Sequence, residues 1–129
     1  VVSHLETNFK TIDKESNLGD LVSVIADSER NVIPVIDEDA NFYGVVFIND
    51  IRNIMFNQDL YEEIMVSSIM YMPDTLIHPE ESMEQVAHKF QETGHYNIPV
   101  IDDGEYLGFV SRARIFSTYQ KLLKEFSEE

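Results

Sequence analysis

The histidines are the side chains that could most readily bind a metal ion or transfer a proton. The sequence contains four of them, His4, His78, His88 and His95, and no cysteine. No two histidines have the i, i+4 spacing with an acidic companion that a helical zinc site requires. Without cysteine there is no thiolate ligand, thiol nucleophile or disulfide. We therefore predict no metal site.

Acidic residues are the second group with catalytic potential. Glu80, Glu81 and Glu84 lie together at the start of a predicted helix, where carboxylates interact favourably with the helix dipole. We interpret them as helix-stabilising residues rather than as a catalytic pair. Neither a Ser-His-Asp arrangement nor a glycine-rich phosphate loop is found. We therefore predict that the chain is not an enzyme.

The charge and hydropathy of the chain exclude two further classes of partner. There are 24 acidic and 9 basic residues, for a net charge of −15, which repels phosphate backbones and anionic membrane surfaces. No apolar run approaches the roughly 18 residues that a membrane-spanning helix needs. We expect neither nucleic-acid binding nor membrane insertion. Because the chain starts at Val1 without a signal-peptide pattern, we also expect a fragment of a longer cytosolic or membrane-attached protein.

An internal repeat organises the whole chain. The segment Ile33–Asp37 recurs with identical residues as Ile98–Asp102, a shift of 65 residues. Downstream, Phe42–Val46 matches Tyr106–Val110 at a shift of 64, so one residue is lost in the intervening turn, where deletions are tolerated. Repetition at this spacing indicates two copies of one structural unit.

Each copy is predicted to fold as β-α-β-β-α. A helical stripe precedes the repeated segment, capped by Ser16 or Asn17 in the first copy and by Ser82 in the second. Apolar runs at 32–36 and 45–48 predict a hairpin. Because proline lacks an N–H group, we expect Pro34 and Pro99 at a strand start or on an unpaired edge. The stripe of the first copy consists of Leu18, Leu21, Val22, Ile25 and Ala26.

A final helix completes each copy, and its apolar positions suggest a partner. One copy of this size buries little core, so we predict an α+β fold of two repeats related by a pseudo-two-fold axis and packed as one module. The predicted parts are repeat one at 1–56, a linker helix at 57–65, and repeat two at 66–129. The apolar stripes of the final helices are wider than one small body needs, which predicts a homodimer. These positions are Ile51, Ile54, Met55, Ile115, Tyr119 and Leu122.

The sequence resembles a tandem pair of cystathionine-β-synthase-type (CBS) domains. In the second copy the resemblance lies in Val66–Met70, Pro73, Thr75, Pro79-Glu80 and Gly108–Ser111. In the first copy it lies in Val2–Leu5, Thr11-Ile12, Leu18, Ile33–Asp37 and Gly44–Val46. Together these motifs cover nearly the whole chain.

The stretch Phe47–Arg52 and the ending Ile115–Phe126 further resemble the cytosolic tail of bacterial ClC-type chloride channels and transporters. That resemblance implies a location on the cytoplasmic face of the membrane, with the transmembrane domain of the parent chain as a partner. A magnesium-transporter-like protein, an enzyme that carries the module, and a free-standing CBS protein are the alternative parents.

The CBS resemblance also implies a ligand site for AMP, ADP or ATP, with no required cofactor. In the family pattern a glycine is followed by two apolar residues, Ser or Thr, two variable residues and Asp. The hydroxyl and the helix N–H groups bind phosphate, and the carboxylate binds ribose. The residue before the repeated proline offers its backbone to adenine. Carried over to this chain, the candidate ligand residues are Thr11, Ile33, Asp50, Ile98, Ser111 and Arg114.

Each copy departs from this pattern at a different position. The first copy keeps the carboxylate as Asp50 but has Phe47 in place of the hydroxyl. The second copy keeps the hydroxyl as Ser111 but has Arg114 in place of the carboxylate. In the simpler interpretation Asp50 and Ser111 only cap the helices that follow them. Arg112 and Arg114 could instead bind a phosphate. We thus expect weak or absent nucleotide binding. Two functions remain open, a nucleotide-sensing regulatory module and a ligand-independent dimerisation module.

Overall fold

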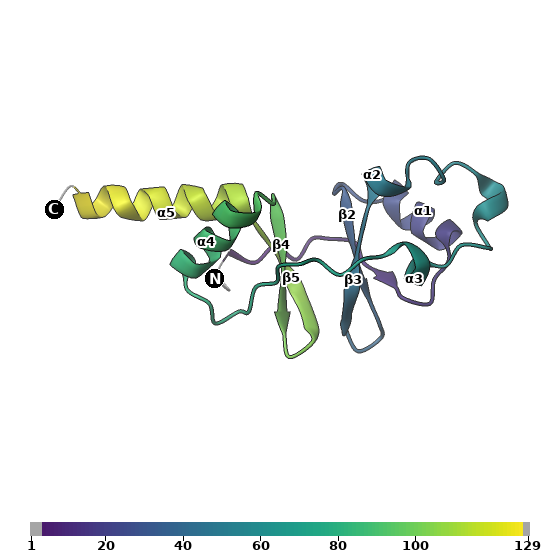
Figure 1. Cartoon of the computed structure of the whole chain (residues 1–129), viewed down its shortest axis with the longest axis horizontal. Coiled ribbons are helices and arrows are strands. Elements are labelled where there is room, and N and C mark those ends of the chain that lie inside the picture. Colours follow the sequence, from purple (N-terminus) through teal and green to yellow (C-terminus); the bar gives the residue numbers. More distant parts are fainter. Residues whose placement is uncertain (1–3, 128–129) are drawn as a thin grey trace. The chain divides into compact units, whose positions relative to one another are not determined.

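The structure is a computed structural model that describes residues 4–127, with side chains described as far as Lys121. The chain contains both helices and strands, which confirms the α+β class (Figure 1). The chain divides into two compact units. Unit A comprises residues 8–73 and 104–106, and unit B comprises residues 4–7, 74–103 and 107–127. None of the described helices is long and apolar enough to cross a membrane.

Unit A contains the elements of the first repeat. In chain order they are β1 (Ile12–Asp13), α1 (Leu18–Ala26), β2 (Val32–Ile36), β3 (Phe42–Phe47), α2 (Ile48–Ile51), the 3-10 helix η2 (Gln58–Leu60) and α3 (Val66–Ile69). The sheet has the order β1-β2-β3, with β1 parallel and β3 antiparallel to β2. The β-α-β-β-α order predicted for this copy is therefore present.

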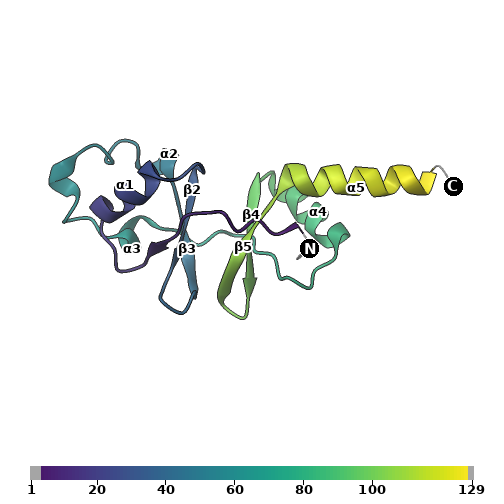
Figure 2. The ribbon, with the colours of Figure 1, turned by 180° about the vertical axis from the view of Figure 1, so that it is seen from behind.

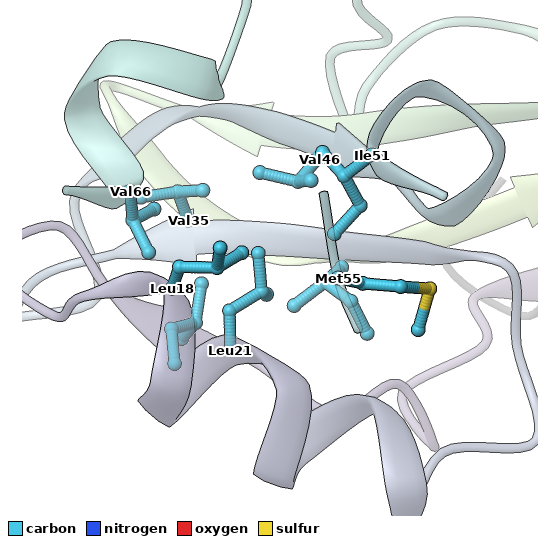
Figure 3. Packing of buried hydrophobic residues seen from close by; sticks show 9 residues of the cluster. Leu18, Leu21, Val35, Val46, Ile51, Met55 and Val66 are labelled. Carbon is cyan, nitrogen blue, oxygen red and sulfur yellow. The ribbon is translucent and has the colours of Figure 1, made fainter. Parts of the chain in front are cut away.

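Helix α1 begins where its cap predicts. Asn17 accepts a hydrogen bond from the N–H of Asp20, whose side chain in turn accepts from the N–H of Asn17. This capping box satisfies two N–H groups that the helix leaves unpaired. The predicted stripe then packs on the sheet, and Leu18 and Leu21 are fully buried. Figure 3 shows both leucines facing side chains of the sheet, of α2 and of α3 across this core.

Pro34 occupies a different place from the one predicted. It lies in the middle of β2, the central strand, and not at a strand start or an edge. Pro34 faces Val45, whose carbonyl accepts the N–H of Tyr71 and so points away from β2. Strand β1 first pairs at Val35. The strand therefore needs no N–H at Pro34. Proline is tolerated wherever the ladder needs no donor, and the prediction was wrong in restricting such places to strand starts and edges.

The final helix of the first repeat is shorter than predicted. Helix α2 ends at Ile51, and the chain continues in turns through Phe56. Ile51 and Met55 nevertheless reach the core of unit A and are buried there. The range 57–65, predicted as a linker helix, contains only the three residues of η2 followed by turns.

Unit B contains the elements of the second repeat, α4 (Met83–Thr93), β4 (Asn97–Asp102), β5 (Glu105–Ser111) and α5 (Arg112–Ser127), except that the first two residues of β5 are grouped with unit A. Helix α4 has the predicted Ser82 cap, which forms a capping box with Gln85. Its core includes the fully buried side chains of Phe90, Ile98 and Ile115. Because Ile51, Met55 and Ile115 are buried within their own units, they give no support to the predicted dimer. The Leu122 side chain lies outside the described residues.

The outer edges of β3 and β5 each pair with the opening segment of the other repeat. In unit A, Val45 and Tyr71 exchange backbone hydrogen bonds of 2.9 and 3.0 Å. In unit B, Phe109 and Glu6 exchange bonds of 2.9 and 2.7 Å, and the N-terminal segment lies beside β5 (Figure 2). These two pairs occupy equivalent positions, since residues 6 and 71 are 65 apart and residues 45 and 109 are 64 apart.

Candidate functional site

The candidate residues of the first repeat lie toward one end of the sheet of unit A. Thr11 directly precedes β1, and Ile33 is near the beginning of β2. Asp50 lies in α2, which follows directly from the end of β3. Because β1 and β2 are parallel and β3 runs the opposite way, the starts of β1 and β2 and the end of β3 meet at one end of the sheet. The topology thus brings these three residues to the same end.

Asp50 does not have the capping role of the simpler interpretation. Helix α2 begins after Phe47, which forms no side-chain cap, and Asp50 is the third residue inside this short helix. Its side chain is exposed. A carboxylate in the first turn of a helix is electrostatically favourable there. The prediction that Asp50 caps the helix is therefore wrong, because the cap position belongs to a residue without a polar side chain.

Phe47 occupies the position where the family pattern has a hydroxyl. Its ring stacks on Tyr71 at a centroid distance of 5.6 Å and an interplanar angle of 28°. Tyr71 is 44% exposed. A hydroxyl at this point would offer a hydrogen-bond donor to phosphate, whereas the aromatic pair offers an apolar surface. The first repeat therefore combines an exposed carboxylate with an aromatic pair.

The second repeat uses its hydroxyl to begin a helix. The Oγ atom of Ser111 accepts the N–H of Arg114 at 3.2 Å, directly before α5. This contact confirms the capping interpretation of Ser111. Ile98 is buried in β4, at the position equivalent to Ile33. Arg114 itself is exposed on the first turn of α5.

Other basic groups lie near the start of α5. The Arg112 guanidinium is 5.8 Å from the centroid of the Phe116 ring. Burial lowers the pKa of His4, and the positive charge of Arg114 adds to this effect. His4 is therefore neutral at pH 7, and the arginines supply the positive charge here. Arg112 and Arg114 are two of the nine basic residues in a chain of net charge −15.

Histidines and carboxylates form pairs, not clusters. Among residues 4–127 the structure has no group of three or more His, Asp or Glu side chains arranged to hold a metal ion. Three histidines each approach one carboxylate, in the pairs His78–Asp102, His88–Glu92 and His95–Asp74, at 3.4, 3.0 and 3.1 Å. Sequence analysis missed these contacts because two of the three pairs join residues more than 20 positions apart.

The acidic cluster before α4 is structural. Glu81 accepts the N–H of His78 and pairs with Lys89 at 2.6 Å. Lys89 also donates to the carbonyl of Leu76. A groove of about 370 Å³ on α4 and α5 is lined by Glu84 and five other residues, none of which belongs to the candidate ligand set.

The family assignment follows from sequence comparison. The sequence model of the CBS domain matches residues 2–57 and again residues 62–121, which together make up most of the chain. This chain belongs to the CBS domain family. The two matches confirm a tandem pair of CBS domains, and CBS domains are regulatory elements.

Two curated proteins are similar to this CBS pair, and both are homoserine O-acetyltransferases. The one from Methanobrevibacter ruminantium is 25% identical over 100 residues, which are 77% of this chain and 19% of that protein. The one from Methanococcus vannielii is 24% identical over 120 residues, which are 92% of this chain and 24% of that protein. The CBS pair thus spans about a quarter or less of the curated relatives it matches.

Solved structures of CBS proteins have the same fold. CbpB in complex with c-di-AMP gives a TM-score of 0.77 at 18% identity and covers 99% of this chain and 89% of that one. The CBS domain of a bacterial CNNM/CorC family Mg²⁺ transporter in complex with ATP gives 0.73 at 19% identity, covering 88% and 82%. CBSX2 in complex with AMP gives 0.73 at 21% identity, covering 93% and 95%.

Proposed function

We propose that this CBS pair is a regulatory module of a larger protein and binds an adenine nucleotide weakly, through the first repeat. The observation that carries the proposal is Asp50, an exposed carboxylate that keeps the ribose position and caps nothing. Three similar CBS structures contain AMP, ATP or c-di-AMP, so adenine is the moiety shared by the ligands of proteins with this fold.

The second repeat supports binding less well. Ser111 already accepts the Arg114 N–H, and Arg114 stands where the pattern needs a carboxylate. In the first repeat the phosphates would be bound without the missing hydroxyl. Losing one charge-assisted hydrogen bond lowers affinity by about ten- to a hundredfold. We therefore expect submillimolar rather than micromolar binding.

For the parent protein, we keep the cytosolic tail of a ClC-type chloride channel or transporter as the proposal. It is supported by the sequence stretches at 47–52 and 115–126. A magnesium transporter is the first alternative, because the CBS domain of such a protein shares this fold. An enzyme that carries the module is the second, because both curated relatives are acetyltransferases. In each case the module itself would be non-catalytic and homodimeric, and the ClC parent would place it at the cytoplasmic face of a membrane.

Calorimetry of the module against AMP, ADP and ATP tests nucleotide binding. We expect the wild type to bind and Asp50→Ala to abolish binding. The control Asp59→Ala changes another exposed acidic residue of unit A and should leave binding intact. Phe47→Ser restores the hydroxyl beside Asp50 and should tighten binding by about ten- to a hundredfold. Absence of binding by both the wild type and Phe47→Ser would exclude nucleotide sensing.

A ligand-independent dimerisation module is the second candidate function. The observation that favours it is that the side chains at both hydroxyl positions already make intramolecular contacts. Phe47 stacks on Tyr71, and Ser111 accepts the N–H of Arg114. Sedimentation equilibrium separates the two candidates. A dimer at tens of micromolar that binds no nucleotide would support dimerisation alone.

A further inference from the structure

An aromatic pair stands in unit A where the family pattern has its phosphate-binding hydroxyl. Phe47 ends β3 and lies opposite Val32 in β2. The next pair in this register is Ile33 with Val46. The Phe47 ring stacks on the ring of Tyr71, with 5.6 Å between the centroids. The stacked rings therefore lie one residue along the ladder from Ile33, whose backbone is the proposed contact of adenine.

Asp50 limits how a ligand can lie beside these rings. It follows Phe47 by three residues, within α2, and its side chain is exposed. Phe47 thus stands between Asp50 and the strand position that pairs with Ile33. A nucleoside with its base at Ile33 and its ribose hydroxyls at Asp50 has its 5′ carbon left to face the rings. In a nucleotide this carbon carries the phosphate.

The backbone around the rings offers little to a phosphate. Helix α2 has only four residues, so few aligned peptide dipoles add up at its start. Its first N–H group, that of Ile48, already donates to the carbonyl of Asn31 at 3.0 Å. A phosphate beside Phe47 would therefore give up hydration for contact with ring carbons.

The charges of unit A also act against a phosphate. The unit contains 13 acidic and four basic residues. Two of these cations already have partners, because Lys14 lies over an aromatic ring and Arg30 donates to an asparagine side chain. The other two, Lys10 and Arg52, are exposed, where water and salt screen their attraction for an anion. An uncharged ligand avoids this repulsion.

We propose that the first repeat selects an adenine nucleoside without a phosphate over the corresponding nucleotides. This selection rests on the proposed function, in which the base is bound at Ile33 and the ribose at Asp50. The 5′ carbon of the nucleoside packs against Phe47 and Tyr71, and no anion has to be desolvated there. The module then responds to an uncharged nucleoside, and phosphorylation of that nucleoside weakens its binding.

Calorimetry of the intact 129-residue chain against adenosine, 5′-deoxyadenosine and AMP tests the selection. We expect adenosine to bind about ten- to a hundredfold more tightly than AMP. In 5′-deoxyadenosine a hydrogen replaces the 5′-hydroxyl, which leaves a methyl group toward the rings. It should bind at least as tightly as adenosine, because an apolar group gains from contact with an apolar surface.

Variants at position 47 assign the selection to the aromatic pair. Phe47→Ser removes one ring and supplies a hydroxyl, so adenosine should bind about three- to tenfold more weakly and AMP should become the preferred ligand. Phe47→Leu supplies no hydroxyl, stays apolar and should keep the preference for adenosine. The control Phe56→Ser changes an exposed aromatic residue of unit A outside the candidate ligand set and should leave both affinities unchanged.

The results distinguish failure of the selection from failure of the proposed function. The selection is overturned if the wild type binds AMP as tightly as adenosine, if Phe47→Ser still prefers adenosine, or if 5′-deoxyadenosine binds more weakly than adenosine. In each of these cases, binding that Asp50→Ala abolishes would leave the proposed function standing. A wild type that binds no adenosine also overturns the selection. If AMP then binds neither the wild type nor Phe47→Ser, the proposed function is wrong as well.

Discussion

The two CBS repeats share their backbone pairing but differ in the side chains at the proposed ligand positions. Val45 and Phe109 each exchange two hydrogen bonds with a segment from outside their own repeat. By contrast, Phe47 stacks on an aromatic ring where Ser111 caps a helix, and Asp50 corresponds to Arg114. The four side chains that differ lie outside the two cores, whereas the ligand positions Ile33 and Ile98 are identical and buried within them. The comparison indicates that the repeats differ at those ligand positions whose side chains do not contribute to core packing.

The largest expected effect tests the backbone pairing that the two repeats share. An added Cβ at Gly44 would lie 2.5 Å from the carbonyl oxygen of Tyr71, and one at Gly108 would lie 2.6 Å from that of Glu6. Gly44 also has a φ of +144°, which other residues rarely adopt. We expect Gly44→Ala and Gly108→Ala each to lower the free energy of unfolding by about 2–4 kcal/mol in urea titrations. A neutral result at either glycine would show that the pairing is not equivalent in the two repeats.

A smaller effect is expected at the helix caps. Asn17 and Ser82 each form a capping box at the start of α1 and α4. Replacing either residue by alanine should cost about 1 kcal/mol of unfolding free energy, measured by chemical denaturation. Ser23→Ala serves as a control within α1, because the Ser23 hydroxyl only donates to the carbonyl of Gly19. Unequal losses at the two caps would mean that one helix contributes less to the stability of its unit.

The smallest effect concerns the turn between β2 and β3, which is one residue longer in sequence than the equivalent turn of the second repeat. Asp37 accepts four hydrogen bonds from Asp39, Asn41 and Tyr43, and the Asn41 side chain is the main cause that lowers the pKa of Asp37 to about 2. Because the pKa is lower in the folded state, this contribution is present above about pH 4 and is lost as the pH falls toward 2.

The Asp37→Ala variant should therefore unfold more easily at pH 6, and its thermal stability should depend less on pH between 4 and 2. Asp39→Ala, at an exposed neighbour, serves as the control for removal of one negative charge from the same turn. Parallel pH profiles of the wild type and Asp37→Ala would contradict the assignment.

Local sequence signals were enough to predict most elements. The stripe from Leu18 to Ala26 with its Asn17 cap, the hairpin strands and the Ser82 cap are confirmed because each depends on a few neighbouring residues. The turn of the second hairpin is also local, since Asp103 and Gly104 both have positive φ, as a two-residue turn requires.

The contacts that were missed depend on distant residues. The single bridges of Glu6 and Tyr71 have no periodicity that a sequence pattern could reveal. The length of α2 was overestimated because Ile54 and Met55 keep helical spacing although the chain there is in turns. At the candidate site, the sequence identified Ser111 as a cap correctly but placed Asp50 wrongly, since Phe47 ends the strand and begins the helix without a polar group.

The pairing of Glu6 with Phe109 has a consequence for synthesis of the chain on the ribosome. Unit A can acquire its Tyr71 bridge once the chain has emerged as far as Tyr71, whereas Glu6 must wait until Phe109 is available. The loop that this pairing closes is roughly four times longer than the loop closed by Val45 and Tyr71, and closing it costs about 1.2 kcal/mol more in chain entropy. The N-terminal segment is then the last piece to dock, and a ribosome-bound intermediate would leave the edge of β5 open to any extended peptide nearby.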